Sequence, residues 1–213
     1  MSQLVLDMIP VDIGVEGCRY YPEALCRDEQ TELVKELRTV LKRAPLFQPT
    51  MPRTDKPLSV RMSNCGPLGW VADKKGYRYQ RTHPVTGKPW PEIPKALFDL
   101  WERVAKGAPK PQACLINWYA PDAKMGLHQD RDEETFDAPV VSVSLGDDAM
   151  FRMGGVERGG KTTGIRLKSG DVLVFGGPSR LAYHGITKIY DATSDLLDAP
   201  GRVNLTLRRV TPA

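Results

Sequence analysis

The sequence has few cysteines, and none of them are spaced in a way that suggests a disulfide framework or a zinc finger. Four are spread over 213 residues, with no CxxC pair: Cys18, Cys26, Cys65 and Cys114. Small secreted domains that depend on disulfides are much richer in cysteine, so reduced thiols are the simplest interpretation. We therefore expect an intracellular protein located in the cytoplasm.

Long apolar runs and targeting signals are also missing. No segment approaches the about 18 consecutive apolar residues that suggest a membrane-spanning helix. The N-terminal stretch lacks a basic region and is interrupted by Asp7, Pro10 and Asp12, which argues against a signal peptide. Repeats and low-complexity tracts are absent as well. We expect no membrane partner, and a net charge of +4 permits a nucleic-acid partner without requiring one.

Two stretches predict helices. Residues 28–41 begin with Asp28 as a capping residue and place four apolar side chains on one face at helical spacing. Residues 94–106 begin with Pro94 and are followed by Gly107, which suits a helix end. Between them, residues 45–94 are rich in proline, glycine and polar residues but also carry aromatics. These aromatics predict either a small satellite core or a surface that binds flat ligands.

After residue 110 the pattern changes to short strands separated by turn residues. The predicted strands are residues 113–119, 140–145, 149–153, 164–167, 171–175 and 202–210. Many short strands of this kind favour a β-sandwich or barrel, with the helices covering one outer face.

The last predicted strand alternates polar and apolar side chains. Period two places Arg202, Asn204, Thr206 and Arg208 on one face. A solvated edge would explain such a face, but two arginines around an asparagine also suit a pocket for a small dicarboxylate. In the strand at 113–119, Asn117 and Tyr119 share a face and either complete that pocket or bond to backbone at a barrel rim.

His128 and Asp130 point the same way in an extended segment, close enough to bind one metal ion. The chain has two other histidines, His83 and His184, and His184 lies just past a predicted strand and turn. Two histidines and one carboxylate with open positions form the facial triad of non-haem Fe(II) oxygenases. A His-x-Asp pair alone usually marks a surface loop, and a His₂Asp set also suits zinc. The arginine strand argues against zinc, because zinc hydrolysis requires no dicarboxylate pocket.

Taken in order along the chain, these motifs resemble the AlkB family of Fe(II)/2-oxoglutarate dioxygenases, which repair alkylated DNA bases. The resemblance runs from about residue 50 to 210, and it is carried by Met62–Trp70, Ala113–Pro121, His128–Glu133, Val141–Gly146, Leu181–Gly185 and Arg202–Arg208. It implies a mainly β α+β fold, a double-stranded β-helix (jelly roll) with N-terminal helices. The implied single domain spans residues 1–213, with an N-terminal extension and helix at 1–45, a nucleotide-recognition lid at 45–90 and the catalytic jelly roll at 110–210.

The resemblance also implies the roles of individual residues. His128, Asp130 and His184 would bind Fe(II). Arg202, with Tyr119 and Asn204, would bind the distal carboxylate of 2-oxoglutarate, and Arg208 and Asn117 would lie near its iron-chelating end. The implied reaction is oxidative demethylation, in which O₂ and 2-oxoglutarate become succinate and CO₂ and the methyl group leaves as formaldehyde.

A second set of residues is implied to hold a base taken out of its stack. Trp70, with the ring of His128 opposite, would sandwich the base, while Tyr77 and Tyr79 would form a polar wall. Asp132 would accept a hydrogen bond from an exocyclic amino group and favour cationic 1-methyladenine and 3-methylcytosine, although a solvated loop acid is the plain alternative. Phosphate contacts are expected from Arg158 and, with less support from the pattern, from Lys74, Lys75, Arg78, Arg81, Arg152 and Lys161. The chain departs from the family pattern outside the metal and co-substrate sets, at Pro67, the Lys74-Lys75 pair, Trp118 and Phe175.

The expected partner is alkylated single-stranded DNA, with duplex DNA or RNA as alternatives, and the chain is expected to act as a monomer. Two other functions compete. One is a related oxygenase that acts on RNA, protein or a small metabolite, in which only the substrate wall differs. The other is a binding protein that keeps the barrel without catalysis, which the intact metal and arginine positions argue against.

Overall fold

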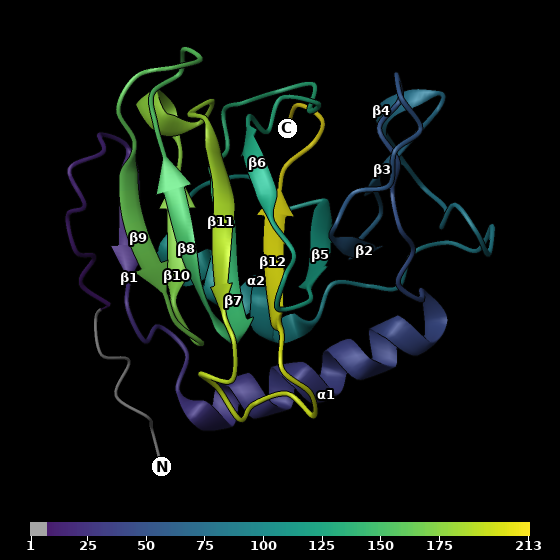
Figure 1. The fold of residues 1–213 in the computed structure, drawn as a ribbon, viewed down its shortest axis with the longest axis horizontal. Helices are drawn as coiled ribbons and strands as arrows, with labels where there is room; N and C mark the ends of the chain where they lie inside the picture. The colour runs from purple at the N-terminus through teal and green to yellow at the C-terminus, as the bar shows by residue number, and fades with distance from the viewer. Residues whose placement is uncertain (1–7) are drawn as a thin grey trace.

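The computed structural model describes residues 8–213, and its central feature is a pair of antiparallel β-sheets (Figure 1). The larger sheet has the order β1-β10-β7-β12-β5-β2. Its strands are β1 (Cys18–Tyr21), β2 (Arg61–Cys65), β5 (Ala113–Tyr119), β7 (Val140–Gly146), β10 (Val172–Phe175) and β12 (Arg202–Arg208). The smaller sheet has the order β6-β11-β8-β9, formed by β6 (Met125–His128), β8 (Asp148–Met153), β9 (Thr163–Leu167) and β11 (His184–Tyr190). This mainly β arrangement confirms the predicted jelly-roll class.

Two helices pack on the outer side of the larger sheet. Leu33 and Leu37 of α1 (Arg27–Arg43) and Trp101 of α2 (Lys95–Val104) share one buried cluster with apolar residues of β7, β10 and β12. The apolar face of β12, which is Val203, Leu205 and Leu207, lies in this cluster. The polar face of the same strand must therefore point to the other side, toward the smaller sheet.

The start of α1 differs from the prediction. Cys26, not Asp28, occupies the N-cap position, and its backbone N–H donates to the carboxylate of Glu29 over 2.8 Å. The carboxylate thus satisfies a backbone donor that a helix start leaves without an intrahelical partner.

A second apolar core fills the space between the two sheets. Leu115 and Phe175 of the larger sheet meet Phe151, Ile165 and Ile186 of the smaller one. The sheets are held together by this core, and the polar inner face of β5 and β12 lies beside it.

The region at 45–94 holds more regular structure than its composition predicted. Besides β2 it forms a hairpin of β3 (Gly69–Asp73) and β4 (Gly76–Gln80), which is a separate two-stranded sheet. Figure 1 shows this hairpin standing beside the two large sheets. The sequence prediction also missed β1, which pairs with β10 and places part of the predicted N-terminal extension in the larger sheet. A single turn of 3₁₀ helix (Gly177–Ser179) precedes β11.

Among the described residues, no helix is both long and apolar enough to cross a bilayer.

Candidate metal and co-substrate site

Three predicted metal ligands meet at the mouth between the sheets. His128 ends β6 and His184 begins the neighbouring strand β11, where the two residues are directly opposite in the antiparallel register. Asp130 follows His128 by two residues. One ligand atom from each of the three lies within 4.8 Å of the others, a spacing that suits a single shared ion.

The two imidazoles are oriented by backbone carbonyls. Nδ1 of His128 lies 3.0 Å from the carbonyl oxygen of Gly126, and Nδ1 of His184 lies 2.9 Å from that of Ala182. A proton on each Nδ1 satisfies these contacts and leaves the Nε2 lone pairs free. Both Nε2 atoms face the Asp130 carboxylate, at 3.7 and 3.8 Å. Metal-binding histidines are usually oriented by this kind of second hydrogen bond, so the donor set fits an ion such as Fe(II).

The protonation states of the buried ligands also suit a metal. Burial by itself would raise the pKa of Asp130, but Arg208 and the two imidazoles outweigh it and hold that pKa well below its usual range. Burial lowers the pKa of His184 to about 4, against the opposing attraction of Asp130. At neutral pH the site therefore offers a carboxylate and a neutral imidazole, which are the forms that coordinate metals.

Beside this site, the register of β5 and β12 pairs the predicted co-substrate residues. Tyr119 lies opposite Arg202, and Asn117 lies opposite Asn204. Because directly opposed residues share a face, all four side chains lie on the inner face. Arg202 and Tyr119 are almost fully enclosed.

Two buried polar atoms in this pocket have no protein partner within the described residues. Arg202 donates to the hydroxyl of Ser144 over 2.6 Å and to the carbonyl of Asp147 over 3.1 Å, but its Nε bonds nothing. The Oδ1 atom of Asn117 is likewise unpaired. Burial lowers the pKa of Arg202 to about 10, which leaves the guanidinium charged at neutral pH. A buried cation with a free donor fits an anionic ligand, and the carboxylate of 2-oxoglutarate supplies one.

Arg208, at the other end of β12, connects this face to the metal ligands. Its Nη2 and Nε atoms lie 2.7 and 3.0 Å from Oδ2 of Asp130. Attraction to Asp130 raises the pKa of Arg208, although burial opposes it, so the ion pair holds the carboxylate in place. The structure thus brings the iron-side arginine of the prediction into direct contact with a predicted iron ligand.

Three of the predicted substrate residues, Trp70, Tyr77 and Tyr79, come from the β3–β4 hairpin, and Asp132 follows the metal ligand Asp130 by two residues. The ring of Trp70 stacks on Tyr77 at 5.7 Å, and its indole Nε1 donates to Asp132 over 2.7 Å. Tyr77 is among the exposed large hydrophobic residues, and Asp132 is also exposed. These three side chains form an aromatic and acidic rim. The hydroxyl of Tyr79 points elsewhere, to Glu133 and Arg208.

The cations that were expected to contact phosphate differ in whether they already pair with a carboxylate. Arg78 forms a two-point ion pair with Asp73, and Lys74 pairs with Asp55 over 2.9 Å, so both already have carboxylate partners. Arg158 is exposed in the loop between β8 and β9. Of these three, Arg158 is the one most open to a phosphate.

Three residues near or outside the site received no role from their sequence pattern. His83 is buried away from the metal ligands, with Nε2 2.7 Å from the carbonyl oxygen of Pro45, and it packs on Phe47. Glu133 and Arg180 are buried near Asp130. Glu133 ends the His128–Glu133 motif but was given no role there, and Arg180 lies outside every motif.

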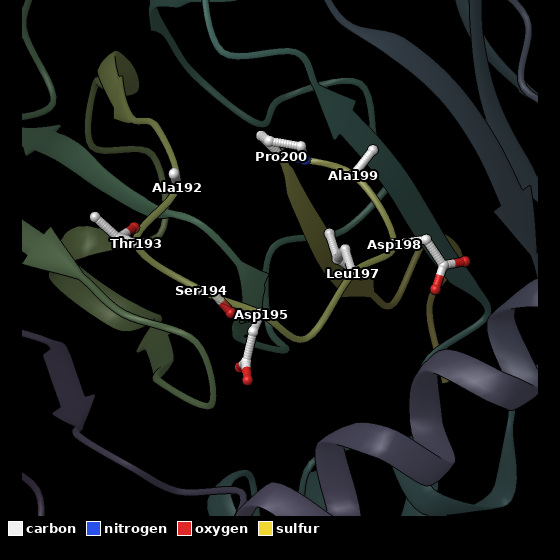
Figure 2. A pocket seen from close by; sticks show the side chains of 8 residues that line it. All are labelled: Ala192, Thr193, Ser194, Asp195, Leu197, Asp198, Ala199 and Pro200. Carbon is white, nitrogen blue, oxygen red and sulfur yellow. The ribbon is translucent and has the colours of Figure 1, made fainter.

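A pocket of about 400 Å³ lies elsewhere, along the loop between β11 and β12 (Figure 2). All its lining residues come from positions 192–200 of that loop. The loop follows Tyr190, at the opposite end of β11 from His184. Its acids Asp195 and Asp198 pair with Arg27 and Arg38 of α1 at exposed positions, so the pocket shows no charge left free for a ligand.

Comparison with known proteins agrees with this geometry. The family model described as the 2OG-Fe(II) oxygenase superfamily matches residues 17–208. The chain is 46% identical over 199 residues to the alpha-ketoglutarate-dependent dioxygenase AlkB homolog of Caulobacter vibrioides, covering 93% of this chain and 90% of that protein. It is 43% identical over 182 residues to the alpha-ketoglutarate-dependent dioxygenase AlkB of Escherichia coli, covering 84% of this chain and 83% of that one. The solved structure of OsALKBH1 superposes with a TM-score of 0.78 at 32% identity, covering 91% of this chain and 96% of that chain.

Proposed function

The chain belongs to the AlkB family of the 2OG-Fe(II) oxygenase superfamily, and on that premise we propose that it repairs N-alkylated bases in nucleic acid by oxidative demethylation. It is an Fe(II)-dependent dioxygenase that uses 2-oxoglutarate and O₂. The proposed substrates are 1-methyladenine and 3-methylcytosine, in single-stranded DNA by preference, and the proposed active form is a monomer.

One observation carries the proposal. The His128, Asp130 and His184 cluster lies beside a buried arginine with a free donor, and an aromatic and acidic rim borders the same opening. A metal site, a dicarboxylate pocket and a surface for a flat ring are the three parts that oxidation of an alkylated base requires. All three come from one chain, which supports the proposed monomer.

The residues divide the work between them. His128, Asp130 and His184 would hold Fe(II), while Arg202, Tyr119 and Asn204 would bind the distal carboxylate of 2-oxoglutarate. Arg208 and Asn117 would lie toward its iron-chelating end. The chemistry supplied when iron, 2-oxoglutarate and O₂ are bound is oxidation of the N-methyl carbon, with release of succinate, CO₂ and formaldehyde.

The rim orients the base. Trp70 and the ring of His128 would enclose the flipped base between them, with Tyr77 and Tyr79 as the wall, and Arg158 would contact a phosphate. The indole of Trp70 is fixed by its 2.7 Å bond to Asp132. The second oxygen of Asp132 would accept from the exocyclic amino group, and its negative charge would favour a base made cationic by alkylation.

Mass spectrometry of a 1-methyladenine oligonucleotide tests the proposal. Incubation with the protein, Fe(II), 2-oxoglutarate and O₂ is expected to remove the methyl group, and His128→Ala is expected to abolish the loss. Asp137→Ala, which changes an exposed acid in the segment after Asp130, serves as the matched control. Single-stranded DNA, duplex DNA and RNA of one sequence would rank the strand preference.

Two results would contradict the proposal. An intact methyl group alongside succinate formation would keep the oxygenase and move its substrate elsewhere. Absence of succinate in every condition would leave only a binding function.

A further inference from the structure

The β3–β4 hairpin is a small element that needs outside support. It pairs with no other strand, and a two-stranded hairpin alone is only marginally stable in water. At its base, the side chain of Asn64 bonds the backbone of Trp70 in both directions, each bond 3.0 Å long. Two further bonds hold its backbone, since the N–H of Thr50 donates to the carbonyl of Ala72 over 3.2 Å and Nε1 of Trp90 donates to that of Gln80 over 2.9 Å. None of these bonds involves the side chains of Trp70 and Tyr79.

Two consecutive acids, Asp132 and Glu133, accept hydrogen bonds from the face of the hairpin that is turned toward the metal site. Trp70 and Tyr79 are directly opposite each other in the β3–β4 register, so they share that face. Asp132 accepts from Trp70, and the next residue, Glu133, accepts from the hydroxyl of Tyr79 over 2.5 Å. Each strand of the hairpin is thus bonded to one of two neighbouring carboxylates.

The two carboxylates differ in their surroundings. Asp132 is exposed, so water or a base can replace its partner at little cost. Glu133 is buried, with its side chain only 1% exposed, and Nη2 of Arg180 lies 3.3 Å from its Oε2. A buried charge is held by its partners because separation leaves it uncompensated. The hydrogen bond from Tyr79 to Glu133 is therefore harder to break than the one from Trp70 to Asp132.

Arg180 fixes Glu133 in relation to the metal ligands. It donates to the carbonyl of Asp130 over 2.7 Å and to that of Ala138 over 3.2 Å, while its guanidinium lies 5.1 Å from the ring centre of Phe136. One buried side chain thus ties together both ends of the segment that carries Asp130 and Glu133. The hydroxyl of Tyr79 also accepts from Nη1 of Arg208 over 3.1 Å, and Arg208 pairs with Asp130.

We propose that Glu133, with Arg180 as its buried counter-ion, is a positioning residue that fixes the hairpin over the metal site through the hydroxyl of Tyr79. In this arrangement the hydroxyl of Tyr79 holds the hairpin, while its ring stays part of the wall around the base. The second oxygen of Asp132 remains available to the base. The effect on the nucleotide rests on the proposed function, whereas the effect on the hairpin does not.

Hydrogen exchange of the metal-free protein tests the positioning directly. Glu133→Gln replaces the carboxylate with a neutral amide, so the hydroxyl of Tyr79 loses its bond to a charged acceptor. Tyr79→Phe removes the hydroxyl and keeps the ring. In both variants we expect the amides of residues 69–80 to exchange roughly tenfold faster, the size of one lost hydrogen bond to a charged group. The double variant is expected to match the single ones, because both break the same bond.

Matched controls lie next to each altered residue. Glu134→Gln changes an exposed acid, and Tyr77→Phe removes a hydroxyl that makes no hydrogen bond within the described part of the chain. Neither is expected to change exchange in the hairpin. Faster exchange spread over β7 and β12 as well would mean general destabilisation and would overturn the proposal, as would unchanged exchange in residues 69–80.

Kinetics of Glu133→Gln provide a second test. We expect KM for a methylated oligonucleotide to rise roughly tenfold, for the same lost bond, while KM for 2-oxoglutarate stays within twofold. An equal rise in both constants would show that Glu133 acts through Arg208 and would overturn the positioning role. If the wild type removes no methyl group, the proposed function fails while the exchange result still decides the positioning of the hairpin.

Discussion

The proposed co-substrate pocket and the proposed substrate rim are supported in very different ways. Arg202, Asn204 and Arg208 project from β12, which is paired along its length with β5 on one side and β7 on the other. Trp70, Tyr77 and Tyr79 project from a hairpin that pairs only with itself. A backbone ladder on both sides fixes the first set, whereas the second depends on isolated hydrogen bonds to the hairpin and on the packing of Val71 in the second core.

This difference suits two kinds of ligand. A dicarboxylate of constant shape benefits from a rigid pocket, since little conformational entropy is lost when it binds. A base attached to a polymer requires a surface that can close around it after it has left its stack. We expect substitutions on β12 to affect the co-substrate in every assay, and substitutions on the hairpin to affect only reactions that include nucleic acid.

Arg202→Ala should give the largest effect on activity. A small effect would contradict the contrast between β12 and the hairpin. Loss of a buried, charge-assisted contact costs about 2–5 kcal/mol, so KM for 2-oxoglutarate should rise about 30-fold or more. The rise should appear with and without nucleic acid, as measured by succinate formation. Arg209→Ala, which removes a guanidinium that bonds backbone carbonyls near the C-terminus, is the control and should leave this KM unchanged. An Arg202→Ala effect confined to assays with oligonucleotide would contradict the co-substrate role.

Trp70→Ala should give the next largest effect, and only on the nucleic-acid side. Stacking of one base on an aromatic ring contributes about 1–3 kcal/mol, which predicts a rise of about 5- to 150-fold in KM for a methylated oligonucleotide. Oxidation of 2-oxoglutarate without nucleic acid should fall far less. Trp70→Phe keeps a ring but removes the donor to Asp132, so it should lie between the wild type and Trp70→Ala. Equal losses of demethylation and of 2-oxoglutarate oxidation would show that Trp70 does not stack on the base.

The smallest effect should come from the ion pair at the end of the hairpin. The hydrogen bond from Arg78 lowers the pKa of Asp73 to about 2, from an ordinary value of 3.8. Because the folded pKa is the lower one, the pair stabilises the hairpin above about pH 4, and this contribution is lost as pH falls toward 2. Both side chains are partly exposed, so Asp73→Asn should cost well under about 1 kcal/mol at neutral pH. An NMR titration of the Asp73 carboxyl carbon checks the value, and a midpoint near 3.8 would show that the pair does not form in solution.

The sequence predicted the strands of the pocket closely and the hairpin poorly, for a physical reason. The strand at 113–119 was predicted at its observed bounds, since buried strands carry strong apolar alternation. The predicted strand at 202–210 ends at Arg208 in the structure, where the backbone N–H of Val210 turns to the side chain of Gln112. The hairpin strands are short and largely polar or aromatic, so nothing in their period separated them from loop.

Sequence analysis also assigned no role to the residues that form buried ion pairs. Glu133 and Arg180 lie 47 positions apart and no pattern connects them, yet the fold places their charged groups 3.3 Å apart. His83 shows the opposite case, because a histidine can satisfy both ring nitrogens with backbone groups and need bind no metal. Residue type alone did not distinguish these cases.

The sequence by itself determined which chemistry this protein carries and which face of each central strand bears it. Alternation along β12 places its polar and apolar residues on opposite faces, and this does not depend on which strands pair with it. The order of the motifs identifies the family. The tertiary structure alone decided the pairing of Tyr119 with Arg202, the contact of Arg208 with Asp130 and the support of the hairpin by Glu133. These features depend on strand register and on contacts between distant segments, which are fixed only when the two cores pack.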